Sequence, residues 1–163
     1  MNNLTETQKA WLAGFIDGEG YLGITFQRKK ETRLQAASPL LHPYVVVVNT
    51  NREVLQHIRE LIGDGHVYLS KKGSDRTKES YQYKLTKMVV LVDLLEALES
   101  YFRIKSQQCR ILIEFTRRRM STTRKTGRGS RGVTSFTTLD FSSYRALLAL
   151  NKRGPSHHAP LPR

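Results

Sequence analysis

The sequence predicts one α+β domain built around an antiparallel sheet, and three observations lead to this fold class. The chain of 163 residues is about the length of one ordinary domain. Hydrophobic residues make up 39% and charged residues 25%, which is typical of a globular protein with a packed core. Helical and extended periodicities succeed one another in the order helix, two strands, helix, two strands, helices. Residues 1–151 are therefore expected to form a single domain, and residues 152–163 a disordered tail.

The first helix is expected from about Glu6 to Gly18 or Glu19. Thr5 and Gln8 have the spacing of a capping box, in which each side chain accepts a hydrogen bond from the other residue's backbone N–H. Gly20 stands where the helix should end, because glycine is common just past the last helical turn.

Two strands should follow this helix. Residues 21–27 alternate in the period-2 pattern of a half-buried strand, and one face is assigned to the core: Leu22, Ile24 and Phe26. Residues 28–43 are polar and contain prolines, which indicates a long loop. Residues 44–48 are mostly β-branched, which favours a second strand.

The second half of the chain continues the alternation of periods. We expect a helix over 52–62 ended by Gly63, strands over 66–70 and 80–85, helices over 87–102 and 106–119, a mobile basic loop over 120–136 and a helix over 141–151. The return strand should place Tyr81, Tyr83 and Leu85 inward. The last helix is expected to bury Tyr144, Leu147 and Leu148.

The charge balance points to the class of partner. The formal net charge is +13 and the sequence pI is about 10.2, so nucleic acid is the first candidate and an anionic membrane surface the second. The single cysteine, Cys109, excludes an intrachain disulfide and is expected to be a packed thiol. No apolar run approaches a membrane span and no secretory signal is evident, so we expect an intracellular protein, in a prokaryotic cytoplasm or an organelle.

The segment 12–20 reads LAGFIDGEG and resembles the motif of the LAGLIDADG homing endonucleases. It departs from that motif at Phe15, Gly18 and Glu19, and the last change keeps the charge. The resemblance implies the αββαββα fold of that family from about Thr5 to Arg119, with an antiparallel DNA-binding saddle and extra C-terminal helices. The chain holds one copy of the motif, so the resemblance also implies a homodimer.

A stripe of small residues supports a close helix pair. Ala10, Gly14 and Gly18 recur every four positions and so share one helix face. Glycine costs up to about 1 kcal/mol relative to alanine inside a helix, which argues that the stripe serves a backbone-to-backbone contact. The alternative is that the glycines pack against the chain's own sheet. The dimer interface that the resemblance implies comprises Ala10, Ala13, Gly14, Asp17 and Gly18.

Glu19 is expected at the C-terminal end of the first helix, where the helix dipole disfavours a negative charge. A cation would compensate that charge, and divalent metals favour carboxylate and backbone carbonyl oxygens, here those of Glu19 and Gly18. The ordinary alternative is a solvated surface glutamate. Within this motif the resemblance implies a Mg²⁺ ligand from each subunit, with Mn²⁺ as a substitute and Ca²⁺ binding without supporting cleavage.

Three further catalytic residues follow from the resemblance. Lys105 corresponds to the family's active-site lysine, which stabilises the anionic transition state or polarises water. Its alternative is a salt-bridged surface lysine. Asn49, at the end of the second strand, matches a position that orders solvent near the metal, and Arg52 is the nearby basic residue. Asp17 is also expected to help to fix the end of the first helix.

The polar face of the sheet is expected to read DNA. It would present donors, acceptors and cations to base edges and phosphates: Tyr21, Thr25, Gln27, Lys29, Tyr68, Ser70, Lys72, Ser80, Gln82 and Lys84. Any antiparallel sheet with one wet face has a similar pattern, so the face gains its meaning from the charge and the motif. Phosphate contacts, or else a merely solvated basic loop, are expected of Arg117, Arg118, Arg119, Arg124, Lys125, Arg128 and Arg131.

These observations predict a site-specific, metal-dependent homing endonuclease. The resemblance implies a double-strand break with 3′ cohesive ends in a long pseudo-palindromic target, and an intron-encoded enzyme. The main alternative is an RNA maturase or a non-cleaving DNA-binding protein of the same fold. Retention of Glu19 and Lys105 favours the nuclease, because a binding protein needs neither.

Overall fold

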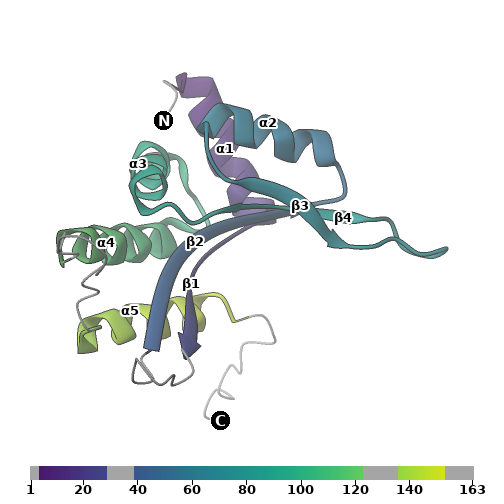
Figure 1. Cartoon of the computed structure of the whole chain (residues 1–163). Coiled ribbons are helices and arrows are strands. Elements are labelled where there is room, and N and C mark those ends of the chain that lie inside the picture. Colours follow the sequence, from purple (N-terminus) through teal and green to yellow (C-terminus); the bar gives the residue numbers. More distant parts are fainter. Residues whose placement is uncertain (1–3, 29–38, 123–135, 153–163) are drawn as a thin grey trace, which may run out of the picture.

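The structure is a computed structural model, and it describes residues 4–28, 39–122 and 136–152. The described elements run in the order α1 (Glu6–Glu19), β1 (Gly20–Arg28), β2 (Pro39–Asn49), α2 (Arg52–Ile62), β3 (His66–Lys71), β4 (Ser80–Leu85), α3 (Met88–Leu98), the 3₁₀ turn η1 (Glu99–Tyr101), α4 (Ser106–Thr122) and α5 (Thr138–Leu150) (Figure 1). This order confirms the predicted α+β class, and α2 and β4 have the predicted bounds.

The four strands form one sheet in the order β1-β2-β4-β3, and every neighbouring pair is antiparallel. The register brings Leu22, Val45 and Leu85 side by side on one face. This inner face carries the hydrophobic core, and the helices pack against it (Figure 1). The opposite, outer face carries Tyr21, Val46 and Lys84 side by side. Both β3 and β4 contact α2, and the tip of the hairpin that they form projects beyond the helices, as Figure 1 shows.

Helix α1 passes into β1 without a loop. Its start is the predicted capping box: Gln8 N–H donates to Thr5 Oγ1 at 3.3 Å, and Thr5 N–H donates to Gln8 Oε1 at 2.9 Å. At its end Gly20 is in extended conformation and its N–H still donates to the carbonyl of Ile16. A Cβ at Gly20 would lie 2.6 Å from that oxygen, so only glycine permits this sharp change from helix to strand.

Strand β2 begins earlier than the sequence predicts. Residues 39–43, expected in a loop, pair with β1, in which Arg28 lies opposite Pro39 and Ile24 opposite Pro43. The prolines are tolerated because β4 pairs only with residues 45–49, so this part of β2 has a strand on one side only and loses no ladder hydrogen bond on the other. The inward alternation continues through it, with Leu41 buried.

Three other expectations are corrected around α4 and α5. Phe26 faces inward but remains 38% exposed, because it lies beyond the main core and contacts the rings of Phe141 and Tyr144 on α5. Leu147 is the buried apolar residue of α5, and Leu148, one position further round the helix, is 45% exposed. Residues 120–122, expected in the basic loop, extend α4. The rest of that loop and the tail from residue 153 lie outside the described residues.

Cys109 is a buried free thiol, as predicted, and its Sγ donates to the carbonyl of Leu95 at 3.6 Å. Burial raises the pKa of this thiol to about 12. In the described part of the chain, no helix is both long and apolar enough to cross a membrane.

Candidate active site and nucleic-acid interface

The outward face of α1 is smooth where its glycines lie. Gly14 and Gly18 are exposed, and a Cβ added to either would meet no atom within 4 Å. The described fold therefore does not need these glycines for its own packing, which removes the alternative that they contact the chain's own sheet. Ala10 is exposed on the same face, and Trp11, 37% exposed, contacts the ring of Phe15 in a tilted arrangement with ring centres 5.4 Å apart.

Two residues predicted for a dimer interface face the other way. Ala13 is fully buried in the chain's own core, and Asp17 is only 8% exposed. The expectation that their side chains contact a partner is wrong, because each directly precedes a glycine of the stripe and so lies about 100° round the helix from it, on the side that faces the chain's own fold.

Glu19 is exposed at the junction of α1 and β1. The last turn of α1 contains no basic residue, so the helix itself supplies no charge to balance the carboxylate. Among the described residues, its side chain has no hydrogen-bond or ion-pair partner. Both its oxygens are therefore open to a ligand, and the carbonyl of Gly18 lies in the same turn.

Asp17 joins this end of α1 to the turn that precedes α4. Its carboxylate accepts the backbone N–H groups of Arg103 at 2.8 Å, Ile104 at 3.1 Å and Lys105 at 2.9 Å. Burial raises the pKa of Asp17, but these three bonds and the Lys105 charge outweigh it and hold the pKa below its usual value. Lys105 in turn donates from Nζ to the carbonyl oxygen of Asp17, so its ammonium lies at the end of the helix that carries Glu19.

Asn49 and Arg52 lie at the same end of the sheet. The β1–β2 ladder ends at the pair Gly20–Val47, so Glu19 and Asn49 both lie just beyond it. Asn49 Oδ1 accepts the N–H of Asn51 at 2.8 Å, which shapes the turn into α2. The Arg52 guanidinium lies 5.8 Å from the centre of the Tyr81 ring, opposite Asn49 in the sheet. The structure thus places all four predicted catalytic residues near one end of the sheet.

The outer face of the sheet carries most of the residues predicted to read DNA. The strand register places on it Tyr21, Thr25, Gln27, Tyr68, Ser80, Gln82 and Lys84, together with Val46 and Val48. Ser70 lies at a register shift in β3 and its hydroxyl donates to Gln82 Oε1 at 3.5 Å. Lys72 is exposed in the turn between β3 and β4. Lys29 lies outside the described residues.

The sequence did not identify two residues of this face as candidates for DNA contact. His42 falls in the predicted loop, and Tyr44 was considered only as a strand residue. His42 and Tyr44 line a hollow of about 450 Å³ with Thr25, Gln27, Lys84, Thr86, Lys87 and Met88. Tyr44 stacks on Tyr21 with ring centres 5.8 Å apart, and Lys84 Nζ lies 5.4 Å from the Tyr44 ring centre. Burial, with a smaller contribution from Tyr21, raises the pKa of Tyr44 to about 12, so this phenol remains a hydrogen-bond donor at neutral pH.

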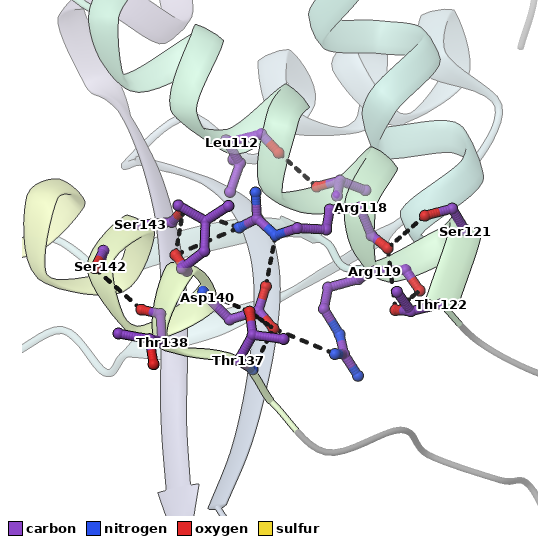
Figure 2. Close-up of polar contacts among 12 residues, drawn as sticks. Leu112, Arg118, Arg119, Ser121, Thr122, Thr137, Thr138, Asp140, Ser142 and Ser143 are labelled. Carbon is purple, nitrogen blue, oxygen red and sulfur yellow. Dashed lines mark hydrogen bonds and ion pairs between the residues drawn. The ribbon is translucent and has the colours of Figure 1, made fainter.

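The arginines at the end of α4 mostly bind their own chain. Arg118 Nε donates to Asp140 Oδ1 at 2.9 Å and Arg119 Nη1 to Asp140 Oδ2 at 3.3 Å, as Figure 2 shows. Arg119 is only 6% exposed and its guanidinium lies 4.1 Å from the centre of the Phe136 ring. The expectation that Arg118 and Arg119 contact phosphate is wrong, because these interactions fix α5 to α4. Arg117 remains exposed and pairs with Glu96 at 2.7 Å. Arg124, Lys125, Arg128 and Arg131 lie outside the described residues.

The antiparallel sheet has a largely polar outer face, and an exposed carboxylate and a lysine lie at one end of it, a combination that can bind and cut nucleic acid. A profile of the LAGLIDADG endonuclease family matches residues 12–113, which is more than half of the chain. The chain belongs to the LAGLIDADG endonuclease family, with a single copy of the motif.

Solved structures similar to this chain show the same fold. I-CvuI in complex with the I-CreI target matches with 18% identity and a TM-score of 0.64, over 93% of this chain and 86% of that one. The archaeal intron-encoded homing endonuclease I-Vdi141I complexed with DNA matches with 18% identity and a TM-score of 0.59, over 89% and 94%. I-GzeII in complex with its DNA target matches with 12% identity and a TM-score of 0.58, over 87% of this chain and 43% of that one. No curated protein sequence matches the chain.

Proposed function

We propose that the protein is a divalent-metal-dependent endonuclease that binds a long, pseudo-palindromic DNA site as a homodimer and cuts both strands to leave 3′ cohesive ends. The observation that carries this proposal is the exposed carboxylate of Glu19, which has no partner among the described residues, at the same end of α1 where Lys105 Nζ donates to the Asp17 carbonyl. The outer face of the sheet would lie along the DNA, with Lys84, Gln82 and the residues of the hollow toward base edges and phosphates. An intron-encoded enzyme is the context that we expect.

The residues present fit a hard divalent cation. Glu19 offers a carboxylate and Gly18 a carbonyl oxygen, which are ligands that Mg²⁺ accepts. Among the described residues, no three His, Cys, Asp or Glu side chains gather into a metal cluster, so one chain supplies only part of such a site. When bound, the ion would supply an activated water and neutralise charge on the phosphate. Glu19 would hold it, and Lys105 would stabilise the anionic transition state. The two I-CvuI complexes were obtained with Ca or Mg.

Two features support a homodimer. The smooth face of α1 allows a second helix to approach closely, since Gly14 and Gly18 leave open space where side chains would stand. The chain also matches less than half the length of I-GzeII, as expected if two copies of this fold are needed for one DNA site. A two-fold axis through this face would bring two Glu19 residues together and make a pseudo-palindromic target a geometric expectation.

The decisive test of the nuclease is Glu19→Gln. Duplex DNA made by joining the two exons that flank the gene, and a plasmid library of random inserts, would be incubated with Mg²⁺, and cut ends would be captured by adapter ligation. We expect the wild-type protein to cut and the variant to lose cleavage by at least about 100-fold while it still binds the same DNA with Ca²⁺. Equal cleavage by the two proteins, or cleavage in excess chelator, would contradict the proposal.

The dimer is tested separately with Gly14→Leu. Because no described residue would meet a Cβ at this position, the variant should fold, but its side chain should block the helix pair. Light scattering is expected to give about twice the chain mass of 18.7 kDa for the wild type and the single mass for the variant. Glu114→Leu, on the exposed face of α4, is the control and should remain dimeric.

A further inference from the structure

Asp17 holds a loop that lies far away in the sequence. Its two carboxylate oxygens accept three consecutive backbone N–H groups, those of Arg103, Ile104 and Lys105. The carbonyl of Lys105 accepts the N–H of Cys109 at 2.9 Å, so Lys105 is the N-cap residue of α4. Asp17, in the last turn of α1, thus fixes the turn that leads into α4.

The same turn returns a hydrogen bond to α1. Lys105 Nζ donates to the main-chain carbonyl of Asp17. That carbonyl lies in the last turn of α1, where carbonyl groups lack partners within the helix. Asp17 therefore holds Lys105 twice: its side chain fixes the backbone of the lysine, and its carbonyl fixes the ammonium.

We propose that Asp17 is a positioning residue, which acts in cleavage only through Lys105 by setting where the lysine ammonium stands relative to Glu19. The inference rests on the proposed nuclease function. If Asp17 served folding alone, the bonds from its carboxylate to the backbone N–H groups of residues 103–105 would be sufficient. The additional bond from Lys105 Nζ to the same residue makes the place of the ammonium depend on the place of Asp17.

The variant that tests this is Asp17→Asn. The amide keeps the shape and one acceptor oxygen, so the chain should fold, but its NH₂ group opposes one backbone N–H and loosens the turn. Cleavage of the target duplex in Mg²⁺ would be measured under single-turnover conditions, and binding of the same duplex in Ca²⁺. We expect a rate about 100-fold lower, since a displacement of about 1 Å can cost that much, with binding changed less than about 3-fold.

A double variant separates positioning from a general loss of structure. If Asp17 acts through Lys105, Asp17→Asn added to Lys105→Ala lowers the rate no further than Lys105→Ala alone, within about 3-fold. Multiplied losses in the double variant would overturn the inference. If the wild-type protein leaves every duplex intact, the nuclease proposal fails and this inference fails with it, so the two failures are distinguishable.

Asp140→Asn is the matched control, because Asp140 is also a buried aspartate that fixes a helix end, but it holds α5. At a temperature where all variants are folded by circular dichroism, its cleavage rate should stay within about 2-fold of wild type. Hydrogen exchange of the amides of residues 103–105 should accelerate in Asp17→Asn and not in Asp140→Asn. Equal rate losses in the two variants, or unchanged exchange in Asp17→Asn, would overturn the inference.

Discussion

Two buried aspartates of this chain use similar chemistry for different ends. Asp17 lies in the motif and its carboxylate accepts three neutral backbone N–H groups. Asp140 lies outside the segment that matches the family and its carboxylate binds two guanidinium groups, besides the N–H and hydroxyl of Thr137. Both oxygens of each aspartate are used to join two helices.

The partners explain what each junction can do. Backbone donors cannot move unless the chain moves. Asp17 therefore fixes the main chain of residues 103–105, from which the Lys105 side chain extends. Side-chain donors are long and adaptable, so the Asp140 junction, drawn in Figure 2, can hold α5 on α4 without dictating any position near Glu19. The donors that bind each buried carboxylate therefore indicate its role. The backbone N–H donors at Asp17 fix the main-chain position of residues 103–105, and the guanidinium donors at Asp140 hold α5 against α4.

The largest expected effect belongs to Asp140→Ala. The variant removes the carboxylate that pairs with the buried Arg119. Removing one partner of a buried ion pair costs about 3–5 kcal/mol, because the other charge remains desolvated. Urea unfolding followed by circular dichroism should show a loss of this size. A loss below about 1 kcal/mol would mean that the packing of Leu147 and Phe141, not the ion pairs, holds α5.

The second prediction uses pH to compare the two aspartates. Both have a pKa below the usual 3.8: burial raises it in each case, but backbone N–H bonds outweigh burial at Asp17, and Thr137 and Arg118 outweigh it at Asp140. A carboxyl group with a lowered folded pKa stabilises the protein fully above its unfolded pKa and loses that contribution as the pH falls through the folded pKa.

The stability difference between the wild type and either asparagine variant should therefore be constant near neutral pH. It should shrink as the pH falls below about 3.8, as measured by urea unfolding at a series of pH values. A difference that does not depend on pH would show that the lost packing or geometry, rather than the ionised carboxylate, causes the destabilisation.

The contrast between the two aspartates also marks what the sequence can and cannot reveal. Local periodicity and caps predicted α1, α2 and β4, since the signal of each lies within its own residues. The glycine stripe and Glu19 were recognisable for the same reason, because the motif is contiguous. The early start of β2 was hidden by its prolines, which are acceptable only because β4 pairs with the later part of the strand.

The bonds of Asp17 and Asp140 could not be predicted in the same way. The partners of Asp17 are 86 to 88 residues away, and their N–H groups carry no sequence signature. Arg118 and Arg119 were predicted to bind phosphate because they belong to a run of arginines. Nothing in that run indicates that both side chains pair with Asp140, which lies 22 and 21 residues further along the chain. Their assignment depends on how α5 docks, which only the three-dimensional fold determines.

The smallest expected effect comes from Arg117→Ala and sharpens the comparison within one run of arginines. Arg117 pairs with Glu96 at 2.7 Å, yet its side chain is 64% exposed, so solvent screens the pair and its loss should cost at most about 1 kcal/mol in urea unfolding. Because Arg117 keeps an accessible charge, it is also the arginine of the run that can still contact phosphate. We expect its loss to weaken DNA binding and to lower the slope of log affinity against log salt concentration by about 0.9, whereas an unchanged slope would assign it to the Glu96 pair alone.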